Sequence, residues 1–280
     1  MFALIRFEIR KLASQRRSLT ALLVVVLMNV LFTIAFLMRY QSRGGKPVPG
    51  LEGRLGAEFL NGMMYAQSIL APCIFMLFPM IVSIVGCHIL ASEIEVGSIR
   101  LMACRRVSRW QILIAKFVAL CGYSGLLMLA LLCVSYACGA FFFDPQGDVV
   151  IIGHMWTFDK GVFLLPQEIA GQRLLLSYLF SWPLLMSVSA MSLLFSLVTR
   201  HFTSASILTT TVYFCSYIVC GIPFLSAIHP FLPTRHMPFF RFALLPQIPW
   251  DRIGTHAFWT FGYTALFLGL AIAIFNVQEL

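Results

Sequence analysis

The segment ASEIEVGSIRLMACRRVSRWQILIAK, residues 91–116, carries two carboxylates and five basic side chains. The runs beside it, 62–91 and 117–143, contain no Asp, Glu, Lys or Arg. Each run is longer than the 20 or so apolar residues that a membrane-spanning helix needs. The pattern therefore predicts two transmembrane helices joined by a short polar connection.

The composition extends this interpretation to the whole chain. Its 280 residues are 60% hydrophobic and 11% charged, whereas a soluble domain is about 25% charged. We therefore expect an integral membrane protein. The net charge of +9 does not indicate nucleic acid as a partner, because the basic residues are scattered and no aromatic-basic recognition module occurs. Their expected partners are the headgroups of the lipid bilayer.

The eight cysteines form no C-x-x-C pair, and seven of them lie within apolar runs. We expect them to pack as small, reduced apolar residues, with no metal site. The six histidines include no H-E-x-x-H motif.

Six apolar runs predict an all-α integral membrane fold that forms one transmembrane domain over residues 1–280. The spans are expected at residues 18–38, 62–91, 111–143, 174–199, 202–228 and 253–276. The segment 229–252 is rich in proline, which interrupts helices, yet it remains apolar and aromatic. We expect it to dip partly into the outer leaflet.

The distribution of basic residues predicts the orientation. With the N-terminus inside, the inner segments hold eleven of the twenty Lys and Arg residues. Ten of the eleven lie in residues 6–17 and 100–116, close to the ends of spans, where basic charge orients helices most strongly. We expect a multi-pass protein of the bacterial cytoplasmic membrane with both termini in the cytoplasm.

Residues 1–17 are expected to form an interfacial helix. Phe2, Ile5, Ile9 and Leu12 recur at helical spacing, which favours a helix lying in the headgroup plane. The basic residues assigned to it are Arg6, Arg10, Lys11, Arg16 and Arg17. The alternative is a frayed tail whose basic residues only fix the orientation.

The cytoplasmic segment 92–110 is predicted to form a helix-break-helix elbow. Gly97 and Ser98 end one helix, and Ser98 can cap a short new helix over residues 99–103. Ser108 and Gln111 match a capping box, so the third span should begin at Ser108. Lys116 lies two turns further on and should extend its amine back to the headgroups. Such a charged projection suits docking on a soluble partner; the alternative is a solvated loop without one.

The order E-x-E-x-G-[ST], then V-S-R, then Lys resembles the ABC-2 family of ABC transporter permeases. The matching residues are Glu93, Glu95, Gly97, Ser98, Val107, Ser108, Arg109 and Lys116. One departure is Arg106, because the family often has proline at that position.

The resemblance implies that segment 92–110 is a coupling helix that docks on a cytosolic ATPase. The implied ATPase-coupling residues are Glu93, Glu95, Gly97, Ser98, Arg100, Arg105, Arg106, Arg109 and, at a second contact, Arg200. It further implies two ATPase subunits, which bind ATP and magnesium, and a second permease copy or a paralogue. The chain itself would bind no cofactor.

The chain lacks the G-x-x-x-x-G-K-[ST] motif, so it is not expected to supply the ATP chemistry itself. The resemblance implies a non-enzymatic permease subunit of an exporter. An ATPase-independent carrier or assembly factor is one alternative. The absence of Asp, Glu, Lys and Arg from the middle of every span counts against an ion-coupled carrier. An intramembrane enzyme is a further alternative. The sequence identifies no substrate and no substrate-binding residue.

Overall fold

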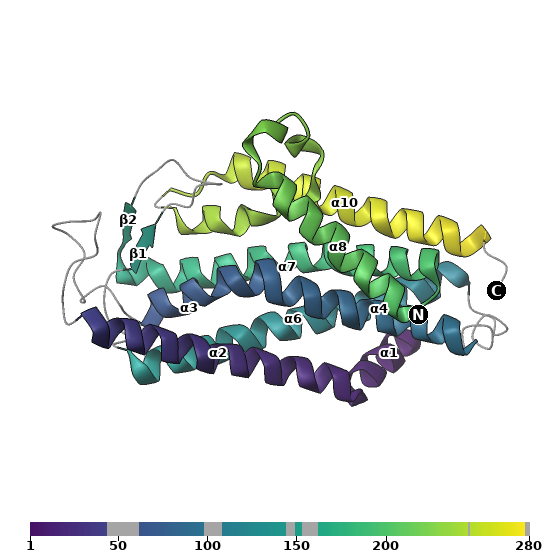
Figure 1. The fold of residues 1–280 in the computed structure, drawn as a ribbon, viewed down its shortest axis with the longest axis horizontal. Coiled ribbons are helices and arrows are strands. Elements are labelled where there is room, and N and C mark those ends of the chain that lie inside the picture. The colour runs from purple at the N-terminus through teal and green to yellow at the C-terminus, as the bar shows by residue number, and fades with distance from the viewer. Residues whose placement is uncertain (44–61, 98–107, 144–148, 153–161, 246, 278–280) are drawn as a thin grey trace.

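A computed structural model describes residues 1–43, 62–97, 108–143, 149–152, 162–245 and 247–277. Long helices run side by side along the long axis of an elongated bundle, and both termini lie at one end (Figure 1). We call this the terminal end. The shared position of the termini agrees with an even number of spans.

Six helices in the described part of the chain are long and apolar enough to cross a membrane. Gly62–Val96 is one continuous stretch made of α3 (Gly62–Pro72), the π-helix η2 (Cys73–Leu77) and α4 (Phe78–Val96). The other elements of this size are α2 (Arg16–Arg43), α6 (Arg109–Phe142), α7 (Gln167–Thr199), α8 (Phe202–Cys220) and α10 (Trp250–Val277). The predicted all-α class is confirmed. The exception is an antiparallel hairpin of β1 (Val149–Ile152) and β2 (Val162–Leu165), which pairs Val149 with Leu165.

Two helices differ in extent from the apolar runs that predict their spans. The fourth span was expected from residue 174, but α7 begins at Gln167, directly after Pro166. A charged residue such as Arg173 ends an apolar run without ending a helix. The fifth span was expected to reach residue 228, but α8 ends at Cys220. Gly221 follows it, and Pro223 cannot continue the helical hydrogen bonding.

The proline-rich segment folds as a series of short helical turns against the bundle. These are η3 (Pro223–Leu225), η4 (His229–Phe231), α9 (Pro233–His236) and η5 (Met237–Leu244). The side chains of η5 are buried except for Pro238, and they include Arg241, which stacks on the rings of Phe75 and Phe240. η5 is thus part of the folded core, whereas η3 and η4 have no buried residue. The depth of the segment in the membrane stays a prediction.

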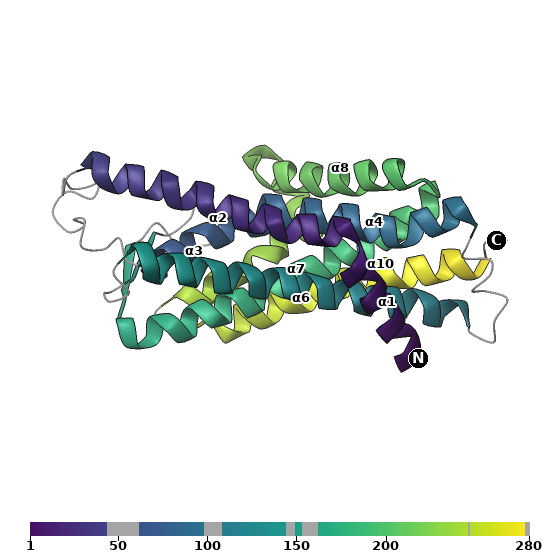
Figure 2. The ribbon, with the colours of Figure 1, turned by 90° about the horizontal axis from the view of Figure 1, so that it is seen from below.

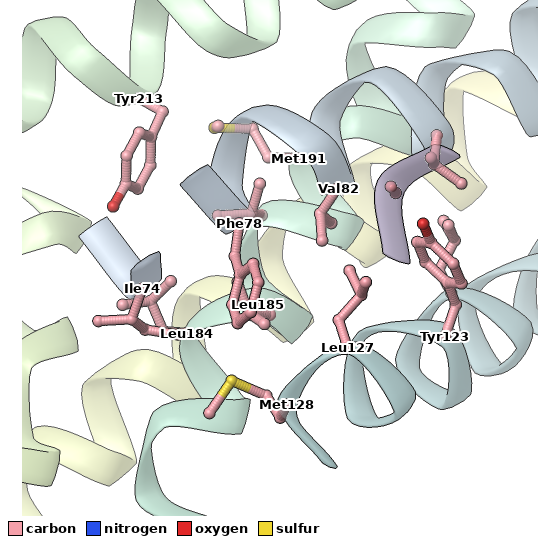
Figure 3. Close-up of a cluster of buried hydrophobic side chains, with 14 of the residues drawn as sticks. Ile74, Phe78, Val82, Tyr123, Leu127, Met128, Leu184, Leu185, Met191 and Tyr213 are labelled. Carbon is pink, nitrogen blue, oxygen red and sulfur yellow. The ribbon is translucent and has the colours of Figure 1, made fainter. Parts of the chain in front are cut away.

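The core is centred on α7. In the most apolar window of α7, 67% of the residues are buried, against 22% in the windows of α2 and α10. Phe78, Val82, Leu127 and Leu185 gather between α4, α6 and α7 (Figure 3). Small residues bring these helices close: a Cβ added at Gly86 would lie 2.1 Å from the hydroxyl of Ser192. This rigid centre holds the ends of its helices at fixed positions.

Candidate functional site

The candidate site is the terminal end of the bundle, where the predicted elbow joins α4 to α6. Residues 98–107 lie outside the described residues, and so does the short helix expected over residues 99–103. The structure therefore does not place Ser98, Arg100, Arg105 or Arg106. It does describe both ends of the elbow, together with the helices that contact them.

Gly97 ends α4 as the sequence predicts. Its φ of 76° lies in the left-handed region, and its N–H donates to the Ile94 carbonyl at 3.1 Å. Glycine adopts this conformation without the steric cost that a Cβ brings. The break in the helix is therefore fixed by the backbone at the residue where the elbow begins.

Ser108 occupies the N-cap position of α6, which confirms the predicted helix start. The capping-box prediction is wrong, because the Ser108 side chain makes no cap hydrogen bond. The N–H of Gln111, which a capping box would pair with that hydroxyl, donates instead to the Ser108 carbonyl at 3.0 Å. The Gln111 N–H is thus satisfied by the Ser108 backbone carbonyl and not by the Ser108 hydroxyl.

A buried charge cluster joins three helices near this end. It consists of Glu8 and Lys11 from α1 (Phe2–Ser14), Glu93 from α4 and Lys116 from α6. The Lys116 Nζ lies 3.0 Å from Glu8 Oε1 and 2.7 Å from Glu93 Oε2, and Lys11 forms an ion pair with Glu93. Two ammonium groups thus face two carboxylates, which compensates the cost of burying charge.

The predicted position of the Lys116 amine is wrong. Its amine was expected at the headgroups, but the side chain is 0% exposed and also donates to the Ile89 carbonyl at 3.3 Å. A lysine extends to the membrane surface when no partner is within reach, and here two carboxylates from two other helices surround it. The role of Glu8 was missed because its partner lies 108 residues away in the sequence.

The predicted N-terminal helix is present as α1, and it crosses the bundle rather than running along it (Figure 2). Arg6 and Arg10 are exposed, whereas Lys11 is partly buried against Glu93. The apolar stripe is less regular than expected, because Leu12 is buried but Ile9 is 46% exposed. The side chains of Arg16 and Arg17 lie outside the described residues, and the interfacial position of α1 stays a prediction.

Glu95 ties the end of α4 to the start of α8. Its Oε1 accepts from the backbone N–H of Phe202 at 2.8 Å and lies 3.3 Å from His201 Nδ1. A carboxylate at this position also interacts favourably with the positive end of the α8 dipole. Arg200, one residue before His201, is exposed and has a φ of 57°. Arg200 thus forms the sharp turn between α7 and α8.

Arg109 ties the start of α6 to the end of α10. Its Nη1 donates to the carbonyl oxygens of Phe275 at 3.3 Å and Asn276 at 3.4 Å. The last carbonyls of a helix have no partner within it, so a cation satisfies both their hydrogen bonding and the negative end of the dipole. The second end of the elbow is thereby fixed to the last helix of the bundle.

Taken together, these contacts make the elbow a junction of five helices. Glu93 and Glu95, in its first part, contact α1, α6 and α8, and Arg109, in its last part, contacts α10. The ends of α4 and α6 extend beyond α1 in the direction of the terminal end (Figure 2). No group of three or more His, Cys, Asp or Glu gathers to bind a metal in the described residues.

The family model described as "ABC-2 family transporter protein" matches residues 3–280. The match runs through α1, the elbow and all six long helices. No curated protein matches the chain.

Proposed function

The chain belongs to the ABC-2 family of transporter membrane proteins, and from this membership we propose that it is the permease subunit of an ATP-binding-cassette exporter. In this proposal the bundle forms the translocation path, and separate cytosolic ATPase subunits dock on the elbow. The family implies such ATPase partners. ATP and magnesium bind to them and not to this chain.

The observation that carries the proposal is the set of contacts at the two ends of the elbow. Force applied to residues 98–107 reaches α4 and α6 directly. It reaches α1 through Glu93, α8 through Glu95 and α10 through Arg109. A docking surface connected in this way moves several spans together, which is what a mechanical link between an ATPase and a transport path requires.

The proposed assembly contains two ATPase subunits and two permeases, the second being a copy of this chain or a paralogue. The long helices leave room for such a partner, since 22% of the most apolar window of α2 is buried, and 28% of that of α8. The remaining surfaces are available to lipid and to the second permease. The elbow and both termini face the cytoplasm of a bacterial cell in this proposal.

The Glu95→Arg variant tests the coupling role. It places a cation against the N-terminus of α8 and removes the acceptor of the Phe202 N–H, so the polar tie between the end of α4 and the start of α8 is lost. We expect the permease-dependent part of the ATPase rate in the purified complex to fall by roughly tenfold, because loss of a charged hydrogen bond is worth about 1.5–3 kcal/mol. Membrane insertion and co-purification of the ATPase should stay unchanged.

Glu168→Arg is the matched control. Glu168 is an exposed acid in the first turn of α7, at the end of the bundle away from the termini. Its reversal should leave the ATPase rate as it is. Equal rates in the Glu95→Arg variant and the wild type would reject the coupling role.

The location of the elbow is tested separately, by single-cysteine labelling at position 96, which is 81% exposed, or at position 108 in intact cells. A membrane-impermeant thiol reagent should label these positions only after the cell is opened. Labelling from outside, or a native complex without an ATPase, would favour the ATPase-independent carrier instead.

A further inference from the structure

Arg241 of η5 is a buried cation that forms no ion pair and no hydrogen bond with any described residue. Its side chain lies within a turn whose apolar residues are also buried, and the residue is 8% exposed. The ion pairs of the described residues have Lys11, Lys116 and His201 as their cations, all near the terminal end. A buried charge without a counterion is costly, so an anion from outside the chain would stabilise Arg241.

Two aromatic rings cover the faces of the guanidinium group. The Arg241 Cζ lies 4.9 Å from the ring centre of Phe75 and 5.8 Å from that of Phe240. The rings attract the cation, but the N–H groups of a guanidinium point outward in its own plane. The stacking therefore satisfies none of the N–H donors, and the edges of the group remain for an acceptor.

The edges of the guanidinium are accessible to a ligand. Fully enclosed polar atoms without a partner in the described residues occur at Ser18, Tyr123 and Ser187, among others, but none is a nitrogen of Arg241. Because the Arg241 nitrogens also have no partner, they must keep some accessible surface. A molecule can thus reach these donors, although most of the side chain is buried.

The position of the Phe75 ring is fixed by an irregularity of the helix. Pro79 has no N–H, so it cannot bond the Phe75 carbonyl as an α-helix requires. The chain forms the π-helix η2 at this point, and the Tyr213 hydroxyl of α8 donates to the Phe75 carbonyl at 3.2 Å. Such π-helical turns are frequent at functional sites. One wall of the site is therefore held by a contact between two spans.

The depth of the site limits the class of anion. With 19 residues, α8 is the shortest of the six long helices, and its length of about 28 Å just spans a hydrocarbon core of about 30 Å. Its two ends therefore mark the two boundaries of that core. The Tyr217 ring lies 5.5 Å from the Phe75 ring, and Tyr217 is one turn before Cys220, the end of α8. A lipid headgroup at this boundary can reach the guanidinium.

The surface beside the site is apolar. Met76, which follows Phe75, is 59% exposed, and Ile218, which follows Tyr217, is 60% exposed. Within the span of α8 such side chains contact acyl chains. An anion that is attached to a hydrocarbon chain can therefore place its charge at Arg241 and its chain on the outside of η2 and α8.

We propose that Arg241 binds the phosphate or carboxylate group of an anionic amphiphile, such as a phospholipid in the leaflet farther from the terminal end. A planar guanidinium can donate two parallel hydrogen bonds to either group. The site rests on the membrane fold and not on the coupling contacts of the elbow, so either proposal can fail without the other.

Thermal unfolding of the full chain in a neutral maltoside detergent tests the site, with dioleoyl phosphatidylglycerol as the probe. The lipid should raise the unfolding temperature of the wild type, because a ligand of the folded state stabilises it. Arg241→Met should abolish this shift. In the absence of lipid the variant should unfold at the wild-type temperature or above, since it removes an uncompensated buried charge.

Native mass spectrometry of the same samples gives the affinity. The Kd for phosphatidylglycerol should rise at least tenfold in Arg241→Met, because hydrogen bonds to charged groups are strong. Arg241→Lys keeps the charge but loses the planar fork, so its Kd should lie between the two. Arg235→Met is the matched control, because Arg235 is an exposed arginine of the same proline-rich segment. Its Kd should equal that of the wild type.

Three further probes define the ligand. Oleate, which has a carboxylate on a hydrocarbon chain, should also raise the unfolding temperature of the wild type. Dioleoylglycerol, which lacks an anion, and inorganic phosphate, which lacks a chain, should not. A shift from inorganic phosphate equal to that from the lipid would reject the amphiphile. Equal Kd values in the wild type, Arg241→Met and Arg241→Lys would reject Arg241 as the site, and so would a wild type that does not respond to the lipid.

Mass spectrometry of the chain as purified identifies the source of the ligand. A resident lipid co-purifies with the wild type and is depleted in Arg241→Met. A transported amphiphile instead raises the ATPase rate of the wild-type complex and not that of the variant, and only this result depends on the proposed permease function. An anionic amphiphile retained equally by the wild type and the variant would count against the site.

Discussion

Lys116 has no exposed surface and touches two carboxylates that belong to two different helices. The charge at this residue does not orient the protein at the membrane surface; it joins α1, α4 and α6 inside the bundle. Exchange of one charged member therefore affects three helices. The loss of stability should come mainly from the partner that the exchange leaves buried and unpaired.

Lys116→Met should lower the free energy of unfolding by about 3–5 kcal/mol, because Glu8 and Glu93 then remain buried with only Lys11 to pair with. Thermal unfolding in detergent measures the change. Lys116→Met combined with Glu8→Gln should recover part of the loss, since one uncompensated carboxylate is then neutral. An unfolding temperature equal to that of the wild type would show that the cluster contributes no stability.

His236 of α9 should make the stability of the fold depend on pH. Burial lowers the pKa of His236, and the nearby Arg235 lowers that pKa further, against the raising effect of the Pro230 carbonyl that it contacts. Its Nδ1 lies 3.2 Å from His256 Nδ1 on α10. One ring must donate and the other accept, so the contact needs a neutral imidazole.

A group with a lowered pKa stabilises the fold above its unfolded pKa, about 6.5 for histidine. The stabilisation is lost as the pH falls through the lower, folded value. We expect hydrogen exchange in residues 230–245, corrected for its intrinsic pH dependence, to accelerate as the pH falls from 7.5 to 5. His236→Phe keeps the stacking on Trp259 and should abolish this acceleration. An acceleration of the same size in that variant would assign it to another group.

At the scale of elements, α3 and α6 meet at a contact between two glycines. A Cβ at Gly139 of α6 would lie 2.6 Å from the carbonyl oxygen of Gly62 on α3. Real Cβ atoms do not approach backbone so closely, so any side chain at this crossing would push the helices apart.

Gly139→Ala should therefore destabilise the protein by about 1–3 kcal/mol, the usual cost of overpacking. Gly122→Ala is the matched control on the same helix, because a Cβ there meets nothing within 4 Å. It should be neutral or stabilise the helix by up to about 1 kcal/mol. Thermal unfolding of the two variants provides the comparison, and similar losses in both would mean that the crossing tolerates a side chain.

The elements also show which predictions the sequence supports. Apolar runs longer than a bilayer located all six long helices, and Gly97 and Ser108 correctly marked the ends of the elbow. The helices do not end where the charge-free runs end, at residues 174 and 228, because such a run measures hydrophobicity. Pro166 and Gly221 mark where these helices begin and end. The hairpin was missed because its strands have four residues each.

At the scale of the whole molecule, the side-chain contacts that the sequence did not predict join distant parts of the chain. Glu8 meets Lys116 across 108 residues, and Arg109 meets Phe275 across 166. No local periodicity encodes such pairs, since each follows from how the finished helices pack.

The charge cluster has a consequence for biogenesis. Both of its acids precede Lys116 along the chain, so the ribosome completes them before the lysine emerges. We therefore expect the Lys116 ammonium group to find both carboxylates already synthesised when α6 enters the bilayer, so that it need not face lipid as a lone cation. A chain that had lost its first thirteen residues would lack Glu8 and Lys11, and its third span would enter with a single acid as counterion.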